Sequence, residues 1–405
     1  MHLSTLTIAA VICVVAATNK SCAASKTSSA KVQQGLSFYK GHDLSSLKIL
    51  EDGYGPGLGA VFVDTHRGNV SRPLEDILGD AGMNAVRLRQ WVNSPPVPYD
   101  GGYYESYEQE YTLPLAKRFH QKGYCIQLVL YFSDYWTDPG QQAVPKAWPK
   151  TLSGLAATLR EYVANVLLAY KKAGIDLCIL SLGNEVRYGM MWDFGKADPL
   201  VENVSNRTAG FKNFAYLWMS ARKGVDDAVA QGVKKPQVMI QIDNGWDLTI
   251  QSQWYAALTA NNVPESAWDV MGFSFYPFYA TGATFAALEN SLTTLAQRYG
   301  KPIHITETGW PAVCYSTPQS TAPQLSEPNL AVSVQGQIEW THRVIDILRH
   351  LPNNLGQGVW YWETGWLNNT GRGGCQDVIL FDTDFSHLPK LVGYTRESVN
   401  IFKGV

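Results

Sequence analysis

Eight short apolar runs, separated by longer segments of helical periodicity, constrain the fold of this 405-residue chain more than any other feature. Leu155, Leu159, Val163 and Leu167, for example, keep helical spacing between the third and fourth runs. Eight β-rich runs that alternate with helices predict an α/β fold, a single (β/α)₈ TIM barrel. The runs lie near Leu36–Asp43, Asn84–Trp91, Cys125–Tyr131, Leu177–Asn184, Gln237–Asp243, Val270–Tyr276, Pro302–Glu307 and Gly358–Trp362.

A doubly wound dinucleotide-binding sheet is the alternative, because Gly53, Gly55, Gly57 and Gly59 follow the first run. Such a fold needs its glycine-rich turn to join the first strand directly to a helix. Here the glycines begin well after the strand, and no helical pattern starts at Ala60. The glycine run is therefore interpreted as a flexible loop.

The N-terminal segment is typical of a secreted protein. Leu6 to Ala17 is an apolar run too short to cross a bilayer, and small residues follow it, with possible cleavage after Ala17 or Ala24. We expect a signal peptide over 1–24, a disordered segment over 25–35 and the catalytic barrel over 36–405. Four Asn-x-Ser/Thr sequons are then expected glycosylation sites on surface loops, at Asn69, Asn203, Asn206 and Asn368.

Two of the six cysteines lie in the leader. Cys125 and Cys178 sit inside apolar runs and are expected to be buried small hydrophobes. Cys314 and Cys375 lie in loop sequence and are the expected disulfide of an oxidising compartment. No C-x-x-C, H-E-x-x-H or close His pair indicates a zinc site.

Charge and aromatic content narrow the class of ligand. The net charge of −2 gives no reason to expect nucleic acid or a membrane as partner. The chain also carries 13 Trp and 21 Tyr, whose flat apolar faces and polar edges suit stacking on sugar rings.

Polar and aromatic residues end the predicted strands, where a barrel places its catalytic groups. The arginines there could instead be ion pairs at the barrel mouth, and Glu363 could cap a loop. Two carboxylates stand out: Glu185 ends the fourth run and Glu307 the seventh. Strands four and seven face each other across a barrel mouth, so these side chains can converge. Glycosidic cleavage needs one protonated and one ionised carboxyl group.

Eight ordered motifs between about Phe38 and Ile401 resemble the endo-β-1,4-galactanases of glycoside hydrolase family 53, of the fungal type. This family is similar to the clan of barrel glycosidases in which strands four and seven supply acid/base and nucleophile. The motifs are Phe38-Tyr-Lys-Gly41, Val86-Arg-Leu-Arg-Gln-Trp-Val-Asn93, Ser133-Asp-Tyr-Trp-Thr-Asp-Pro139, Gly183-Asn-Glu-Val-Arg187, Asp243-Asn-Gly-Trp246, Gly272-Phe-Ser-Phe-Tyr-Pro-Phe-Tyr279, Glu307-Thr-Gly-Trp-Pro311 and Tyr361-Trp-Glu363.

The resemblance implies a role for each matched residue. Glu185 should be the acid/base and Glu307 the nucleophile, with net retention of configuration. Arg89 should hold the nucleophile ionised, and Tyr276 should donate a hydrogen bond to it. Asn184 should grip the sugar 2-hydroxyl. The reactive subsite and the groove for a linear chain should be lined by Trp362, Trp91, Tyr131, Asp134, Trp136, Asp243, Asn244 and Trp246.

One position departs from the family pattern. Where the family usually has Asp-Phe-His-Tyr-Ser-Asp, this chain reads Val129-Leu-Tyr-Phe-Ser-Asp134, so Tyr131 replaces a histidine near the reactive subsite. The resemblance implies the Cys314–Cys375 disulfide where bacterial relatives bind calcium, and hence no metal and no cofactor.

The expected function is a secreted, monomeric endo-β-1,4-galactanase acting on linear β-1,4-galactan, a side chain of pectin and type I arabinogalactan. One alternative is another endo-glycanase of the same clan, acting on mannan or glucan. The other is a sugar-binding barrel with impaired catalysis, which Tyr131 makes conceivable. Retention of both glutamates argues against a pure binder.

Overall fold

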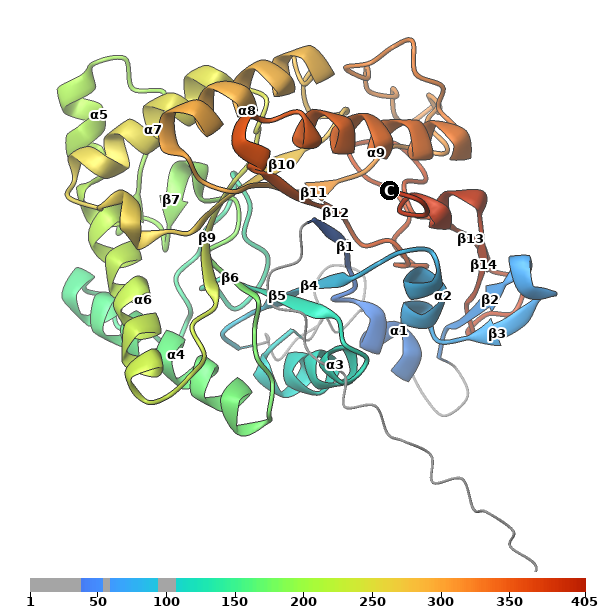
Figure 1. Cartoon of the computed structure of the whole chain (residues 1–405), viewed down its shortest axis with the longest axis horizontal. Coiled ribbons are helices and arrows are strands. Elements are labelled where there is room, and N and C mark those ends of the chain that lie inside the picture. Colours follow the sequence, from blue (N-terminus) through green and yellow to red (C-terminus); the bar gives the residue numbers. More distant parts are fainter. Residues whose placement is uncertain (1–37, 54–58, 94–106) are drawn as a thin grey trace, which may run out of the picture. The chain divides into compact units, whose positions relative to one another are not determined.

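The computed structural model describes residues 38–53, 59–93 and 107–405 (Figure 1). The predicted leader, the segment 25–35, the first two residues of the expected barrel, and Gly55 and Gly57 lie outside the described residues. Eight parallel strands form a closed barrel in the order β1-β12-β11-β10-β9-β6-β5-β4, which confirms the predicted fold. The strands are β1 Tyr39–Asp43, β4 Ala85–Gln90, β5 Cys125–Leu130, β6 Ile179–Leu182, β9 Gln237–Ile242, β10 Val270–Phe275, β11 Ile303–Thr308 and β12 Gly356–Tyr361.

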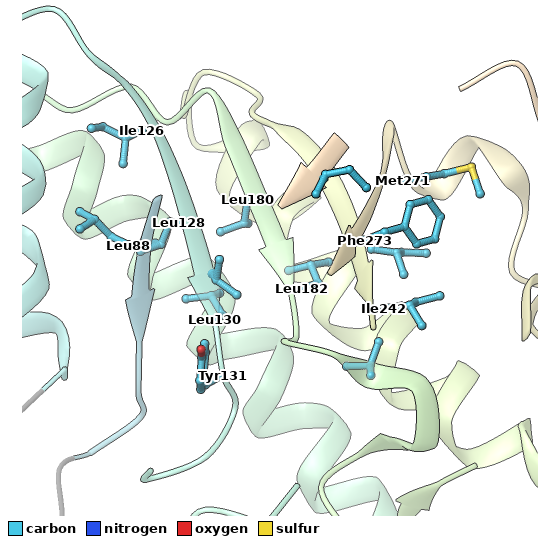
Figure 2. Packing of buried hydrophobic residues seen from close by; sticks show 14 of the residues in the cluster. Leu88, Ile126, Leu128, Leu130, Tyr131, Leu180, Leu182, Ile242, Met271 and Phe273 are labelled. Atoms are coloured by element: carbon cyan, nitrogen blue, oxygen red, sulfur yellow. The ribbon is translucent and has the colours of Figure 1, made fainter. Parts of the chain in front are cut away.

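The barrel strands are apolar because both of their faces are covered. Every residue of β4, β5, β6, β10 and β11 is buried, as expected for parallel strands with side chains filling the barrel and helices packed outside. Figure 2 shows part of this packing, in which Leu88, Leu128 and Leu180 come from three neighbouring strands. Tyr131 lies just past the end of β5, at the edge of the same cluster.

Helices surround the barrel (Figure 1), and several begin at side chains that cap them. Thr151, Asp247, Thr284 and Ser333 each accept a hydrogen bond from the backbone N–H three residues on, which satisfies an otherwise unpaired donor of the first turn. The helices are α1 Leu47–Asp52, α2 Leu74–Asp80, α3 Gln109–Gln121, α4 Leu152–Lys172, α5 Val204–Gly210, α6 Lys212–Ala230, α7 Leu248–Ala260, α8 Phe285–Tyr299 and α9 Val334–Arg349.

Helix α4 carries the helical spacing of apolar residues that was identified in the sequence. Its apolar positions, including Leu155, Leu159 and Val163, are buried. It packs against α6 at Gly224, where a Cβ would lie 2.3 Å from the carbonyl oxygen of Arg160. A larger residue at Gly224 would therefore push the two helices apart.

A second, smaller sheet lies beside the barrel and was not predicted. Its order is β13-β14-β2-β3, and it joins segments from the two ends of the described chain, as Figure 1 shows. Because α1 and then β2 follow the first barrel strand, no helix begins at Ala60 and the dinucleotide-binding alternative is excluded. The strands are β2 Val61–Asp64, β3 Val70–Arg72, β13 Phe381–Asp384 and β14 Val392–Thr395, and a further hairpin pairs β7 Gly189–Met190 with β8 Gly195–Lys196.

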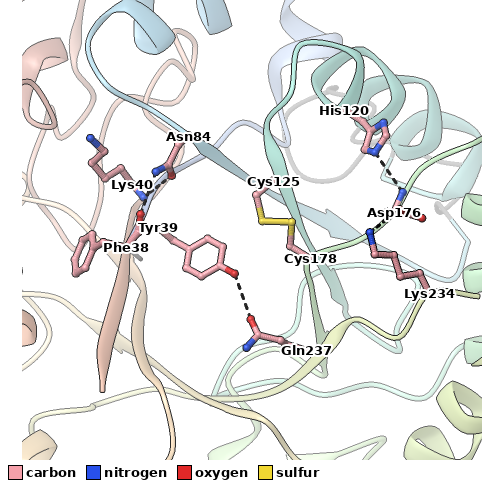
Figure 3. The surroundings of a disulfide bond; sticks show 10 residues. All are labelled: Phe38, Tyr39, Lys40, Asn84, His120, Cys125, Asp176, Cys178, Lys234 and Gln237. Carbon is pink, nitrogen blue, oxygen red and sulfur yellow. Dashed lines mark hydrogen bonds and ion pairs between the residues drawn. A yellow bond between two sulfur atoms is a disulfide. The ribbon is translucent and has the colours of Figure 1, made fainter. Parts of the chain in front are cut away.

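Two disulfides are present among the described residues, and one of them corrects a prediction. Cys314 and Cys375 are joined as expected, with 4.4 Å between their Cα atoms. Cys125 and Cys178, expected to be unpaired, are also joined, with 5.7 Å between their Cα atoms (Figure 3). Gln127 of β5 lies opposite Ile179 of β6, so the register brings the two cysteines together at the start of these strands. Their apolar flanks indicated burial but not this pairing.

The four sequon asparagines are exposed, at Asn69, Asn203, Asn206 and Asn368. The Asn203 side chain also caps α5 by accepting from the Asn206 N–H. Glycosylation at these positions stays a prediction. In the described part of the chain, none of the helices combines the length and the apolar character that crossing a membrane requires.

Candidate active site

A cavity of about 500 Å³ lies at the carboxyl ends of the barrel strands. Both glutamates line it, although they are 122 positions apart in the sequence. Its wall comes from the ends of β5, β6, β9, β10, β11 and β12 and the loops that follow, as expected for a barrel enzyme. The lining residues are Tyr131, Trp136, Asp138, Pro139, Asn184, Glu185, Arg187, Asp243, Asn244, Ser274, Tyr276, Tyr279, Glu307, Trp362 and Arg372.

Glu307 of β11 is held by three donors, which come from β4, from β9 and from the end of β10. Arg87 Nη2 lies 2.5 Å from its Oε1, and Gln241 Nε2 donates to the same oxygen at 2.9 Å. The Tyr276 hydroxyl donates to Oε2 at 3.1 Å, which is the contact expected of this tyrosine. Only 6% of the Glu307 residue is exposed. Charge-assisted hydrogen bonds of this kind fix the carboxylate and stabilise its negative charge.

The arginine beside Glu307 is Arg87, not Arg89 as predicted. Arg87 also pairs with Asp43 and donates to Asn184 Oδ1 at 2.8 Å. Both arginines point into the barrel because side chains on one face of a strand are two residues apart. Which of the two contacts Glu307 depends on the stagger between neighbouring strands of the barrel. This stagger places Arg87 opposite Asp43 of β1.

Arg89 belongs to a network nearer the barrel rim, which Asp43 connects to Arg87 because its Oδ1 lies 3.5 Å from Arg89 Nη1. Its Nη1 lies 2.5 Å from Glu363 Oε1, and its Nη2 lies 2.6 Å from the Tyr107 hydroxyl. Glu363 also accepts from the Ser46 N–H at 3.1 Å. The alternative reading of a barrel-mouth ion pair and a loop-holding glutamate is therefore confirmed for these two residues. Burial raises the pKa of Glu363 to about 7, against the lowering effect of Arg89.

Glu185 occupies a different environment from Glu307. It follows β6 with φ of 46°, in the left-handed region, which turns its side chain into the cavity. It forms no salt bridge with any described residue. Burial raises its pKa well above the ordinary value, and the charges of Glu307 and Asp243 raise it further. A hydrogen bond with Ser274 acts in the opposite direction.

The two carboxyl groups therefore have different surroundings. Glu185 keeps its proton at a higher pH than an ordinary glutamic acid, whereas the Glu307 carboxylate is paired with a guanidinium. A pair of carboxyl groups in different surroundings is the arrangement used for acid and nucleophile in glycoside hydrolysis.

Besides Tyr276 and Asp243, five other predicted residues line the cavity beside this pair. Asn184 is 3% exposed, and its Nδ2 donates to the Thr137 carbonyl at 2.8 Å, which fixes its amide. Tyr131, Trp136, Trp362 and Asn244 are also in the wall. Burial raises the pKa of the Tyr131 hydroxyl well above its usual range.

Asp243, which the prediction also placed in the groove, lines the cavity as well. Its carboxylate lies 3.2 Å from the Arg187 guanidinium. Burial nevertheless raises the Asp243 pKa to about 7, against the lowering effect of Arg187.

Three predicted groove residues do not line the cavity. Trp91 is 1% exposed and packs edge-on behind Trp136, with ring centroids 5.8 Å apart. Asp134 holds its own loop by accepting from the Lys146 N–H at 2.7 Å. Trp246 is half-buried and packs partly against the core. Position at a strand end predicted these residues, but the loop path after the strand decides which side chains face the cavity.

Several cavity residues were missed by the sequence analysis. Arg187, Ser274 and Tyr279 lie within motifs that were quoted but were given no role, and Asp138 lies in the same stretch as Asp134. Arg372 comes from a glycine-rich loop in which no pattern indicated a site. In the described part of the chain, no group of three or more His, Cys, Asp or Glu side chains could hold a metal ion.

Comparison with known proteins gives matches along almost the whole described chain. The model for glycosyl hydrolase family 53 matches residues 39–394. A probable arabinogalactan endo-beta-1,4-galactanase A from Aspergillus fumigatus is 35% identical over 348 residues, which cover 85% of this chain and 89% of that protein. An arabinogalactan endo-beta-1,4-galactanase from Thermothelomyces thermophilus is 34% identical over 360 residues, which cover 88% and 99%. A solved structure from work on two fungal beta-1,4-galactanases superposes with a TM-score of 0.76 at 33% identity, covering 91% of this chain and 99% of that one.

Proposed function

Because this chain belongs to glycosyl hydrolase family 53, we propose that it is an arabinogalactan endo-β-1,4-galactanase that cleaves β-1,4-galactan with retention of configuration. The observation that carries the mechanism is the meeting of Glu185 and Glu307 in one cavity, where burial raises the pKa of Glu185 and Arg87 contacts the Glu307 carboxylate. The named relatives support galactan as the substrate.

In the first step Glu185 acts as acid and Glu307 as nucleophile. Glu185 donates its proton to the glycosidic oxygen while a Glu307 oxygen attacks the anomeric carbon. The carbon–oxygen bond of the glycoside breaks, the leaving chain departs with a new hydroxyl group, and a glycosyl ester forms on Glu307.

In the second step Glu185 acts as a base. Its carboxylate takes a proton from water, whose oxygen attacks the anomeric carbon and releases the Glu307 carboxylate. Two inversions give net retention, and Glu185 is left protonated for the next cycle. Arg87 and Tyr276, which both contact Glu307, stabilise the carboxylate that departs.

The remaining predicted residues bind the sugar chain in this proposal. Asn184 holds the 2-hydroxyl of the reacting sugar, and Trp362 provides the apolar floor beneath it. Tyr131, Trp136, Asp243 and Asn244 contact the sugar units on either side. All six line the same cavity as the glutamates, which supports these roles.

Secretion, glycosylation and domain extent belong to the same proposal. We expect removal of residues 1–24, glycans on the four exposed sequons, and one catalytic barrel over 36–405 that acts as a monomer. The two disulfides support an oxidising compartment.

The test is release of reducing sugar by the purified protein from galactan, mannan, glucan and xylan. Galactan should be cut far faster than the others. Proton NMR early in the reaction should show the β-anomer of the new reducing end first. Preference for mannan or glucan would reassign the substrate, early α-anomer would exclude retention, and binding without cleavage would favour an impaired sugar-binding barrel.

A further inference from the structure

Arg372 is the cationic side chain of the cavity that lacks a carboxylate partner. The only other cation in the described wall, Arg187, lies 3.2 Å from Asp243. Arg372 forms no salt bridge with any described residue. Its Nη1 donates to the Asn369 carbonyl at 2.7 Å, to Asn369 Oδ1 at 3.1 Å and to the Gly371 carbonyl. Nothing in the mechanism proposed above uses this guanidinium.

Among the described residues, two of its three guanidinium nitrogens have no hydrogen-bond partner. Nε and Nη2 of Arg372 are buried without an acceptor among the described residues. The guanidinium carbon lies 4.1 Å from the ring centroid of Trp362 and 5.2 Å from that of Trp366. These ring faces offset part of the cost of burying the charge, but they provide no oxygen acceptor. A buried donor left without an acceptor is destabilising, so this arrangement calls for an explanation.

The loop that carries Arg372 is rigidly built. Arg372 and Cys375 exchange two backbone hydrogen bonds, of 3.0 and 2.8 Å, around a turn in which Gly373 and Gly374 both have positive φ. A Cβ on Gly373 would lie 2.0 Å from the Phe278 ring, so glycine is needed here. The Cys314–Cys375 disulfide anchors the end of the turn.

The same loop supports the nucleophile. Phe278, on which Gly373 packs, stacks on Tyr276 with ring centroids 5.3 Å apart, and Tyr276 donates to Glu307. The backbone at Arg372 is therefore held in fixed relation to the reacting centre. Little entropy is then lost when the side chain binds a ligand.

The charges of the cavity decide which ligand suits Arg372. Asp138, Asp243 and Glu307 line the same wall, and a carboxylate-bearing sugar would be repelled by them. The hydroxyl and ring oxygens of a neutral sugar accept hydrogen bonds from a guanidinium without that repulsion. Arg372 keeps its proton and its positive charge at neutral pH, because burial lowers its pKa only to about 10.

We propose that Arg372 is a specificity-determining residue that donates hydrogen bonds to the oxygens of a neutral sugar unit lying against Trp362. This inference rests on the proposed galactanase function and adds a binding group to it. A small rotation of the side chain, on sugar binding, would exchange its contact with the Trp faces for sugar oxygens.

The experiment compares Arg372→Met, Arg372→Lys and Arg298→Met in the full-length protein. Methionine keeps an apolar stem against Trp362 but has no donors, and lysine keeps the charge without the planar fork. Arg298 is the matched control, because its guanidinium lies 5.3 Å from the Tyr299 centroid outside the cavity. We measure kcat and KM on linear galactan, and affinity for a galacto-oligosaccharide in the Glu307→Ala background, where no turnover interferes.

Arg372→Met should raise KM and weaken oligosaccharide binding at least about tenfold, since hydrogen bonds from a charged donor contribute about 1.5–3 kcal/mol. Arg372→Lys should fall between it and the wild type, and Arg298→Met should match the wild type. An Arg372→Met enzyme with unchanged KM and affinity would overturn the inference and leave the galactanase function standing. Tighter binding of an oligogalacturonate, lost in Arg372→Met, would overturn the neutral-sugar assignment. A wild type inactive on galactan would overturn both proposals.

Discussion

Arg87 Nη2 lies 2.5 Å from Glu307 Oε1, whereas Arg89, two residues further along the same strand, pairs with Glu363. The two arginines are equally buried and equally spaced toward the barrel interior. They differ in position along the barrel axis. Arg87 therefore contacts Glu307, and Arg89 contacts Glu363 nearer the rim. Their substitution should therefore have different consequences.

Arg87→Lys should lower kcat/KM on galactan by about 100-fold, because one ammonium cannot replace charge-assisted contacts to Asp43, Asn184 and Glu307 together. Arg89→Lys is the matched control. Its loss of kcat/KM should be at least about tenfold smaller than that of Arg87→Lys, and its main effect should be a lower melting temperature. Steady-state kinetics and thermal unfolding of both variants give the comparison. Equal losses of kcat/KM would contradict the assignment of Arg87.

The two glutamates should respond differently to the leaving group of the substrate. Glu185→Ala should lose most activity on galactan but recover part of it on aryl galactosides with acidic phenols, which need little protonation. Glu307→Ala should lose several orders of magnitude on every substrate and form no glycosyl-enzyme, because the nucleophile is absent. Rates across a series of leaving groups, with mass spectrometry of the trapped intermediate, make the test. A Glu185→Ala enzyme with the same fractional loss on all substrates would count against the acid role.

The pH dependence of kcat/KM should follow the surroundings of Glu185. Activity requires protonated Glu185 and falls as pH rises through its raised pKa. Asp243→Asn removes a negative charge that raises this pKa, so the basic limb should move to lower pH. Ser274→Ala removes a hydrogen bond that lowers it, so the basic limb should move to higher pH. Profiles of both variants that shift in the same direction would show that another group sets the basic limb.

The barrel and the position of Glu185 and Glu307 could be predicted from the sequence for a physical reason. Buried strands of a parallel barrel are continuous apolar runs, so all eight could be found, and catalytic groups lie where these runs end. That logic placed Glu185 and Glu307 correctly at the cavity. It could not rank Arg87 against Arg89, because both share one strand face and the stagger between strands leaves no trace in local sequence.

The features that were missed depend on contacts distant in the sequence. The sheet formed by β2, β3, β13 and β14 pairs Val61 with Val392, and its short strands carry no clear alternation. The Cys125–Cys178 bond depends on the register of β5 with β6. Arg372 faces the cavity because of a two-glycine turn and a disulfide. Neither feature indicates a binding residue when only the sequence is known.

The two disulfides should have separable effects. The bonds close segments with sequence separations of 53 and 61 residues, so each should stabilise the fold by about 4 kcal/mol in the chain-entropy model. Replacing Cys125 and Cys178 by alanine should lower the melting temperature without changing KM, because this pair lies at the opposite end of the strands from the cavity. The same change at Cys314 and Cys375 should lower the melting temperature and also raise KM. Mass spectrometry of unreduced peptides that found free thiols at either pair would contradict the corresponding bond.

Tyr131 allows the most informative reversal, because it stands where the family usually has histidine. It lines the cavity, as Glu307 does, with 2% of its surface exposed. Burial raises the pKa of its hydroxyl well above the usual range, so the side chain remains a neutral donor throughout the working pH range. Histidine at this position could instead carry charge near neutral pH.

Tyr131→His should therefore move the pH–rate profile or raise turnover, while the rank order of galactan, mannan and glucan stays the same. Tyr131→Phe, which keeps the ring and removes the donor, is the control that separates lost hydrogen bonding from changed titration. If the wild type ignores galactan and Tyr131→His creates that activity, position 131 governs specificity and the galactan assignment of the wild type is wrong.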